Sequence, residues 1–195
     1  MRPVVVVHGI WDDARSIAPL VRGLARQGVE NVSAIELQPP WGNASIESLA
    51  EQLAAFVERA RRLQSAASVD IVGFSMGALV TWAYLQLLGG HAHTRSFVSI
   101  SGPHRGTLTA YALPLLGVRQ MRPGSALLQA LGDDVSHLPE LAVHCVVTPF
   151  DAMIVPSQSG VLRGARSVHR LPVLLHRLMV HDQRVHALVA RLLAS

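Results

Sequence analysis

The chain has 195 residues, of which 50% are hydrophobic and 15% are charged, and its formal net charge is +4. This composition predicts one globular domain with a buried core and excludes a disordered chain. All 17 residues counted as lysine or arginine are arginines, and they are scattered along the chain, so we do not expect a nucleic-acid-binding surface.

The amino-terminal stretch MRPVVVVHG is too short an apolar segment for a signal peptide, and a histidine interrupts it. No window approaches the roughly 18 uninterrupted apolar residues of a membrane span. The single cysteine, Cys145, lies in an apolar run and has no partner for an internal disulfide. We therefore expect a soluble, cytoplasmic protein without a membrane span, and the sequence leaves its oligomeric state open.

Short runs rich in valine and isoleucine alternate with longer segments of helical periodicity. The runs are 3–8, 32–37, 69–74, 96–101, 143–148 and 167–172. The first run is apolar on consecutive positions, which is typical of a strand buried on both faces of a parallel sheet.

Helical spacing of apolar residues is clearest in three places. One helix is predicted over 17–24, a second begins after a cap at Asn43 or Ser45, and the last follows the cap Asp182. Alternating strands and helices predict an α/β fold, a three-layer sandwich whose mostly parallel sheet of about six strands has helices on both faces. We expect residues 1–195 to form a single domain.

Residues 102–142 interrupt this alternation because they contain no strand candidate. They include two apolar stretches, TAYALPLLG and PGSALLQALG, for which we predict helices. So long an insertion is typical of a lid or a substrate-binding segment, although a pair of covering helices would read the same way.

The stretch VDIVGFSMGALV places Ser75 between Gly73 and Gly77, where a strand should meet a helix. A sharp turn there would crowd the residues two positions before and after the serine, and glycine removes the side chains that would collide. Gly-x-Ser-x-Gly in this context is the nucleophile elbow, in which a strained serine projects from the edge of the sheet. A serine that merely caps the helix would fit the same residues.

A serine nucleophile needs main-chain donors for the oxyanion that develops during attack. The amide of Met76 should lie at a helix amino terminus, and the loop in VVVVHGIW can supply the second donor from Ile10, with Trp11 as the less favoured alternative. We expect His8 to brace that loop. Phosphate-binding loops are not indicated, since the chain has no lysine and no Gly-x-Gly-x-x-Gly after its first strand.

With VVVVHGI and GFSMGA both in place, the chain resembles the serine α/β-hydrolases, and it is most similar to small bacterial lipases and esterases with a minimal sheet. The segments SISGPHRGT and MRPGSALLQAL resemble stretches that follow the nucleophile in bacterial triacylglycerol lipases. The resemblance implies a minimal α/β-hydrolase fold and hydrolysis of carboxylic esters, with neither a metal nor a cofactor.

The family order of triad members is Ser, then Asp or Glu, then His. DAMIVP resembles the family's acid loop and implies Asp151 as the acid, since Asp133 and Asp134 precede the fifth strand and fit less well. HRLMVHDQRV resembles the family's His-x-x-Leu-Leu-x-Asp-x-x-Val pattern and implies His176 as the base. One departure is Leu175, where the family usually has glycine.

Three other histidines compete with His176 for the role of base. His169 falls inside a predicted strand and His186 inside the last helix, where it could pair with Asp182, while His181 directly precedes that helix. The HAH sequence at 91–93 has no third ligand nearby, so it is a weak metal signal.

The leading hypothesis is a carboxylic ester hydrolase, an esterase or lipase acting on a small-molecule or lipid ester with a modest preference for short to medium acyl chains. A thioesterase, amidase or acyltransferase would use the same triad, because all of these enzymes pass through an acyl-enzyme. A non-catalytic binding protein on the same fold is the alternative from another class.

Overall fold

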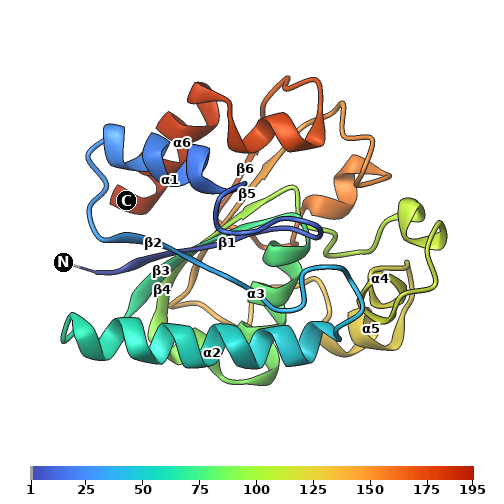
Figure 1. The fold of residues 1–195 in the computed structure, drawn as a ribbon, viewed down its shortest axis with the longest axis horizontal. Helices are drawn as coiled ribbons and strands as arrows, with labels where there is room; N and C mark the ends of the chain where they lie inside the picture. The colour runs from blue at the N-terminus through green and yellow to red at the C-terminus, as the bar shows by residue number, and fades with distance from the viewer. Residues whose placement is uncertain (1) are drawn as a thin grey trace.

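The computed structural model of the protein describes residues 2–195, which form one six-stranded sheet with helices on both faces (Figure 1). The strands are β1 (Val4–Val7), β2 (Val32–Ile35), β3 (Val69–Phe74), β4 (Thr94–Ile100), β5 (Ala142–Val147) and β6 (Ser167–Arg170). Their order across the sheet is β2-β1-β3-β4-β5-β6, and every neighbouring pair is parallel. The predicted α/β sheet of about six strands is confirmed, and it is parallel throughout.

Four longer helices cover the sheet, two on each face (Figure 1). α1 (Ala18–Arg26) and α6 (Gln183–Ala194) lie on one face, and α2 (Ile46–Leu63) and α3 (Met76–Leu87) lie on the other. β1 shows why its four valines run consecutively: Val4 and Val6 belong to the core under α1 and α6, whereas Val5 and Val7 belong to the core under α2 and α3. A strand between two apolar layers needs apolar side chains at both alternations.

Side-chain caps start two of these helices. The Ser45 hydroxyl accepts from the Ser48 amide at 3.1 Å, so of the two predicted caps for α2 the serine is the one that acts. The Asp182 carboxylate accepts from the Arg184 amide at 2.8 Å at the start of α6. His186 does not pair with the Asp182 side chain as expected, because its ring is buried and its Nε2 lies 2.9 Å from the Val180 carbonyl oxygen.

Residues 102–141 contain no strand of the sheet and carry three short helical segments, η2 (Leu108–Tyr111), α4 (Leu116–Gln120) and α5 (Ala126–Leu131), and Ala142 already begins β5. Hydrogen bonds tie this segment to the body of the protein. The Gly117 amide donates to the Gly42 carbonyl at 2.9 Å, and the Trp82 indole donates to the Gly132 carbonyl at 3.0 Å. The remaining short segments are η1 (Gly90–His93), η3 (Ser157–Gly160) and η4 (His176–Val180).

In the part of the chain that the structure describes, none of the helices combines the length and the apolar character required to cross a bilayer.

Candidate active site

Ser75 stands at the junction of β3 and α3, at the carboxyl edge of the sheet, where open α/β sheets bind their ligands. Its φ of 56° and ψ of −125° lie outside the conformations that a serine ordinarily adopts. Its amide donates to the Ile100 carbonyl at 2.9 Å, which fixes the turn against the neighbouring strand β4. Among the described residues its side chain makes no capping bond to α3, so the simple helix-cap interpretation of Ser75 does not hold.

The two glycines of the pentapeptide are needed because backbone passes directly beside them. A Cβ on Gly77 would lie 2.4 Å from the His8 carbonyl oxygen, and one on Gly73 would lie 2.6 Å from the Ala78 Cα. Both contacts are far shorter than a real Cβ makes, and neither backbone can swing away as a flexible side chain could. The sequence Gly-Phe-Ser-Met-Gly therefore allows β1, β3 and α3 to approach closely enough to hold the strained serine.

The loop after β1 lies beside the serine and is oriented by His8. The Leu37 amide donates to His8 Nε2 at 2.9 Å, so in the neutral ring the proton is on Nδ1, which donates to the Gly9 carbonyl at 2.9 Å. Because the peptide is trans, the Ile10 N–H points away from that carbonyl. A Cβ on Gly9 would lie 3.1 Å from the Ser75 Cβ, which places this peptide against the serine.

The other predicted donor, the amide of Met76, is at the first position of α3. The first amides of a helix have no partner within the helix and carry the positive end of its dipole. Met76 and Ile10 thus come from two different elements that meet at Ser75.

His176 and Asp151, which lie 25 residues apart in the sequence, are in direct contact. His176 Nδ1 donates to Asp151 Oδ2 at 2.8 Å and lies 3.0 Å from Oδ1. The imidazole ring packs on Phe74, the residue before Ser75, with ring centroids 4.8 Å apart. Its Nε2 is buried and has no hydrogen-bond partner in residues 2–195, Ser75 included. Hydrogen bonds between catalytic side chains are often long in a free enzyme and tighten when substrate binds.

Asp151 is held as a carboxylate. Burial alone would raise its pKa, but the hydrogen bond and charge of His176, together with the amides of Ile154 and Met153, hold the pKa below its ordinary value. Both amides donate to Oδ1 at 2.9 Å. Hydrogen bonds to the charged form stabilise it, so this carboxylate can orient the imidazole and balance its positive charge.

Three of the competing candidates are engaged elsewhere. Asp133 pairs with Arg163 at 2.8 Å, and the Asp134 carboxylate accepts from the Ser136 amide at 2.9 Å. His169 lies on β6 with its Nε2 2.9 Å from the Ser167 hydroxyl.

The HAH sequence forms part of η1, where His91 Nδ1 lies 2.9 Å from the Leu85 carbonyl oxygen. Across residues 2–195 no group of three or more His, Cys, Asp or Glu side chains is arranged to hold a metal ion.

An ion pair that the sequence did not predict joins the two loops that flank Ser75. Arg177, the neighbour of His176, donates to Asp12 Oδ1 at 2.5 Å, and Asp12 follows the loop that carries Ile10. The Asp12 side chain is almost fully buried, whereas the Arg177 side chain is 67% exposed. The position of Arg177 beside the predicted base was the only signal in the sequence, and nothing there identified its partner 165 residues away.

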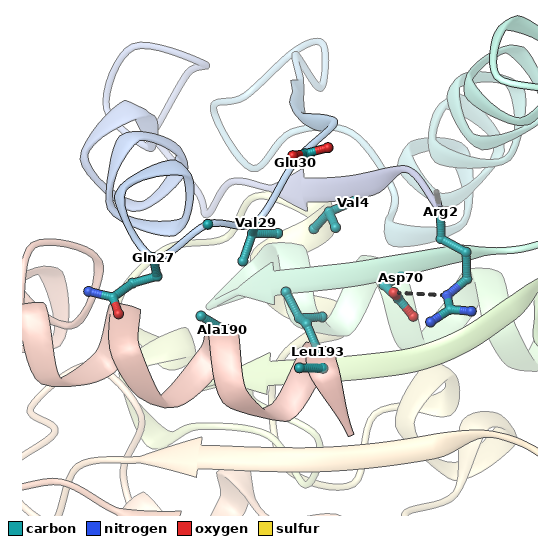
Figure 2. Close-up of a pocket in the computed structure, with 10 residues that line it drawn as sticks. Arg2, Val4, Gln27, Val29, Glu30, Asp70, Ala190 and Leu193 are labelled. Carbon is teal, nitrogen blue, oxygen red and sulfur yellow. Dashed lines mark hydrogen bonds and ion pairs between the residues drawn. The ribbon is translucent and has the colours of Figure 1, made fainter.

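The pocket in Figure 2 lies at the opposite, amino edge of the sheet. It has a volume of about 290 Å³, and its charged lining residues are Arg2, Glu30 and Asp70, the last near the start of β3. The Asp70 carboxylate is already paired with Arg2 at 3.4 Å and with Arg95 at 3.0 Å. The charge of Asp70 is balanced by these two arginines, and Ser75 is at the other end of β3. We therefore do not assign this pocket to the candidate active site.

A strained serine after a central strand of a parallel sheet, followed along the chain by a paired aspartate and histidine, defines the serine α/β-hydrolase class of fold and site. The chain is a member of the α/β-hydrolase superfamily. Within it, a family model described as palmitoyl protein thioesterase matches residues 3–131, well over half of the sequence. The chain belongs to this family, and Asp151 and His176 lie beyond the matched segment.

Curated relatives agree with this assignment. Lysosomal thioesterase PPT2 of Mus musculus is 31% identical over 107 residues, which is 54% of this chain and 35% of the relative. The human protein of the same name gives the same values. The match thus spans about a third of the length of these relatives.

Solved structures show the fold over the whole chain. Lipase B of Aspergillus fumigatus superposes with a TM-score of 0.84 at 17% identity, covering 100% of this chain and 52% of that one. The mature lipase BlEst2 of Bacillus licheniformis gives 0.78 at 13% identity, covering 98% and 91%. The family and the fold are those of thioesterase- and lipase-type hydrolases.

Proposed function

We propose that this protein hydrolyses acyl thioesters and esters through a Ser75–His176–Asp151 triad and an acyl-enzyme intermediate. The observation that carries the proposal is the hydrogen bond from His176 to Asp151 at 2.8 Å. The imidazole ring that makes this bond packs on Phe74, the residue before the strained Ser75. This arrangement supplies a base with an unengaged Nε2 at the edge of the sheet where the serine projects.

In the first half of the reaction, Ser75 Oγ attacks the acyl carbon while His176 Nε2 takes its proton. The negative charge moves to the carbonyl oxygen, which the amides of Ile10 and Met76 stabilise. Asp151 keeps the Nδ1 proton of His176 in place and stabilises the imidazolium. The carbon–sulfur or carbon–oxygen bond then breaks, and the leaving thiolate or alkoxide takes the proton from Nε2.

In the second half, His176 removes a proton from water as the water oxygen attacks the acyl-enzyme. Collapse of the tetrahedral species breaks the bond to Ser75 Oγ, which recovers its proton from His176 and releases the carboxylic acid. No step needs a metal or a cofactor.

Thioesters are the favoured substrate class, because the chain belongs to the palmitoyl protein thioesterase family. Oxygen esters, which the sequence analysis placed first, are the second candidate, since two of the solved structures with this fold carry the name lipase. A preference for short to medium acyl chains, the cytoplasmic location and the use of residues 102–142 as a lid stay predictions. The mouse and human relatives are themselves named as lysosomal.

Graded series of acyl-coenzyme A thioesters, p-nitrophenyl esters and acyl anilides, assayed with the same protein, would test the proposal. We expect thioesters to give the highest kcat/KM and the anilides the lowest. Ser75→Ala and His176→Ala should each lower turnover about a million-fold, and Asp151→Asn about ten-thousand-fold, by analogy with other triads.

Ser101→Ala is the matched control for Ser75→Ala. Ser101 is also a buried serine with a positive φ, 48°, and it directly follows the neighbouring strand β4. A fluorophosphonate probe should label the parent protein and Ser101→Ala equally and leave Ser75→Ala unlabelled. Labelling that survives in Ser75→Ala, or turnover that falls equally in both variants, would rule out Ser75 as the nucleophile.

A further inference from the structure

Large apolar side chains are exposed mainly around the candidate active site. Of thirteen such side chains in residues 2–195, ten lie on five segments: 11–12, 41–42, 105–122, 150–155 and 174–178. We call these five segments the apolar ring. The other three, Leu63, Leu87 and Leu88, are at the carboxyl ends of α2 and α3, away from the ring. Scattered exposed leucines are ordinary, but such a concentration on one edge marks an interaction surface.

Hydrogen bonds join three of the five segments of the apolar ring, starting from the loop after β1. The Trp11 amide donates to the Pro40 carbonyl at 2.9 Å, which places segment 11–12 beside Trp41. The Gly117 amide donates to the Gly42 carbonyl at 2.9 Å, which joins Trp41 and its neighbour to segment 105–122.

The remaining contacts close the ring. The Leu108 amide donates to the Val155 carbonyl at 2.9 Å, joining segments 105–122 and 150–155. The pair of Asp151 with His176 joins the latter to segment 174–178, and the pair of Arg177 with Asp12 returns to segment 11–12. The apolar ring therefore encircles the edge of the sheet at which Ser75 projects.

Every exposed charged side chain on the apolar ring is positive. Its only carboxylates, Asp12 and Asp151, are buried and paired, as described above. Arg105, Arg119 and Arg177 are exposed, although Arg105 lies 4.0 Å from the Asp133 carboxylate and Arg177 is paired with Asp12. A surface of exposed leucine and tryptophan with arginine and no exposed acid is complementary to lipid that carries negative headgroups.

We propose that the apolar ring binds the surface of an anionic lipid bilayer, with its apolar side chains entering the headgroup region and its arginines contacting phosphates. The proposal goes beyond the proposed hydrolysis and does not depend on it, since docking requires no turnover. The proposed partner is a lipid surface and not a second copy of this chain. A ring around the site would bring Ser75 to the membrane, whereas a second copy would cover the site.

Ser75→Ala protein can be mixed with vesicles of phosphatidylcholine alone or of phosphatidylcholine with phosphatidylglycerol, and the bound fraction measured by flotation. Each exposed arginine near an anionic surface is worth about fivefold in binding, so we expect at least roughly tenfold stronger binding to the anionic vesicles. Equal binding to both kinds of vesicle, or binding to neither, would overturn the proposal.

Matched variants separate the ring from the rest of the surface. Leu108→Ser with Leu174→Ser should weaken vesicle binding at least roughly tenfold, whereas Leu63→Ser with Leu87→Ser should change it less than about twofold. Arg119→Gln should cost about fivefold on anionic vesicles only, with Arg26→Gln, an exposed arginine at the end of α1, as its control. Equal losses in the test and control variants would overturn the proposal.

The chain's three tryptophans provide a direct readout. Trp11 and Trp41 lie on the ring and are 47% and 60% exposed, whereas Trp82 is fully buried. Brominated phospholipid should quench the fluorescence of the parent protein, and the quenching should disappear in Trp11→Phe with Trp41→Phe, which keeps Trp82. Binding without quenching would overturn the proposal. So would sedimentation equilibrium showing a dimer that the ring leucine variants dissociate.

Discussion

At the scale of single residues, the site depends on a backbone conformation that only its neighbours can maintain. Ser75 has φ 56° and ψ −125°, a conformation that costs on the order of 1–3 kcal/mol unless the surrounding structure enforces it. Gly73 and Gly77 allow β1 and α3 to close around the turn. The pentapeptide therefore predicted both the turn and its strain. It could not predict that the ring of His176 would pack on Phe74, because that contact joins distant parts of the chain.

Gly77→Ala should destabilise the whole protein. The added Cβ would lie 2.4 Å from the His8 carbonyl oxygen and 2.5 Å from that of Val7, so either β1 or α3 must shift. We expect the free energy of unfolding to fall by about 3 kcal/mol in urea titrations, the upper range for overpacking. Gly89→Ala is the control, since nothing lies within 4 Å of its Cβ and its φ of 68° alone should cost about 1 kcal/mol. Equal losses would contradict this account of the elbow.

At the scale of elements, two loops that lie near Ser75 are joined by one ion pair. Arg177 lies in η4 beside His176, and Asp12 lies in the loop that presents Ile10. The pair therefore fixes the loop of the proposed base, His176, relative to the loop of one proposed oxyanion donor, Ile10. Periodicity predicted the six strands and the main helices, because each is encoded locally. It could not predict a bond between residues 12 and 177, because only the folded sheet brings their two loops together.

Arg177→Gln should lower kcat about tenfold and change KM less, because misplaced catalytic groups are felt mostly in the transition state. Steady-state kinetics on one thioester would measure the change, and Arg177→Lys should restore part of it. Salt should lower the kcat of the parent protein toward that of the variant, since the exposed guanidinium is screened. Arg62→Gln removes an exposed pair with Glu58 within α2 and should leave kcat unchanged. A double-mutant cycle with Asp12→Asn that shows no coupling would exclude this positioning role.

At the scale of the whole molecule, the candidate site is assembled from loops at the carboxyl ends of β1, β3, β5 and β6. Sequence order and motif resemblance were enough to nominate Ser75, Asp151 and His176, since each directly follows a recognisable strand or loop pattern. The apolar ring was beyond sequence analysis. Its leucines and tryptophans are residue types that also form the core, and only the fold decides which of them face solvent.

The stability of the whole molecule should depend on His104, a buried histidine that takes no part in the proposed reaction. His104 Nε2 lies 2.6 Å from the Ser99 hydroxyl, and the ring packs edge-on against Trp82 and Phe97. Burial lowers the pKa of His104 from 6.5 to about 3, with a smaller contribution from the charge of Arg105. A histidine whose folded pKa is depressed stabilises the protein fully above its unfolded pKa of 6.5, and that contribution is lost as the pH falls toward 3.

Between those two pH values the unfolded chain binds a proton at His104 that the folded chain does not. The free energy of unfolding should therefore fall by about 1.4 kcal/mol for each pH unit of acidification from this residue alone. Urea titrations across this range would measure the slope, and subtracting the slope of His104→Gln isolates the histidine from the carboxylates that titrate with it. His93→Gln, at an exposed histidine, should leave the slope unchanged. If His104→Gln does not fold, NMR titration of the parent protein decides the matter: protonation of His104 above about pH 5 in the folded state would contradict the burial argument.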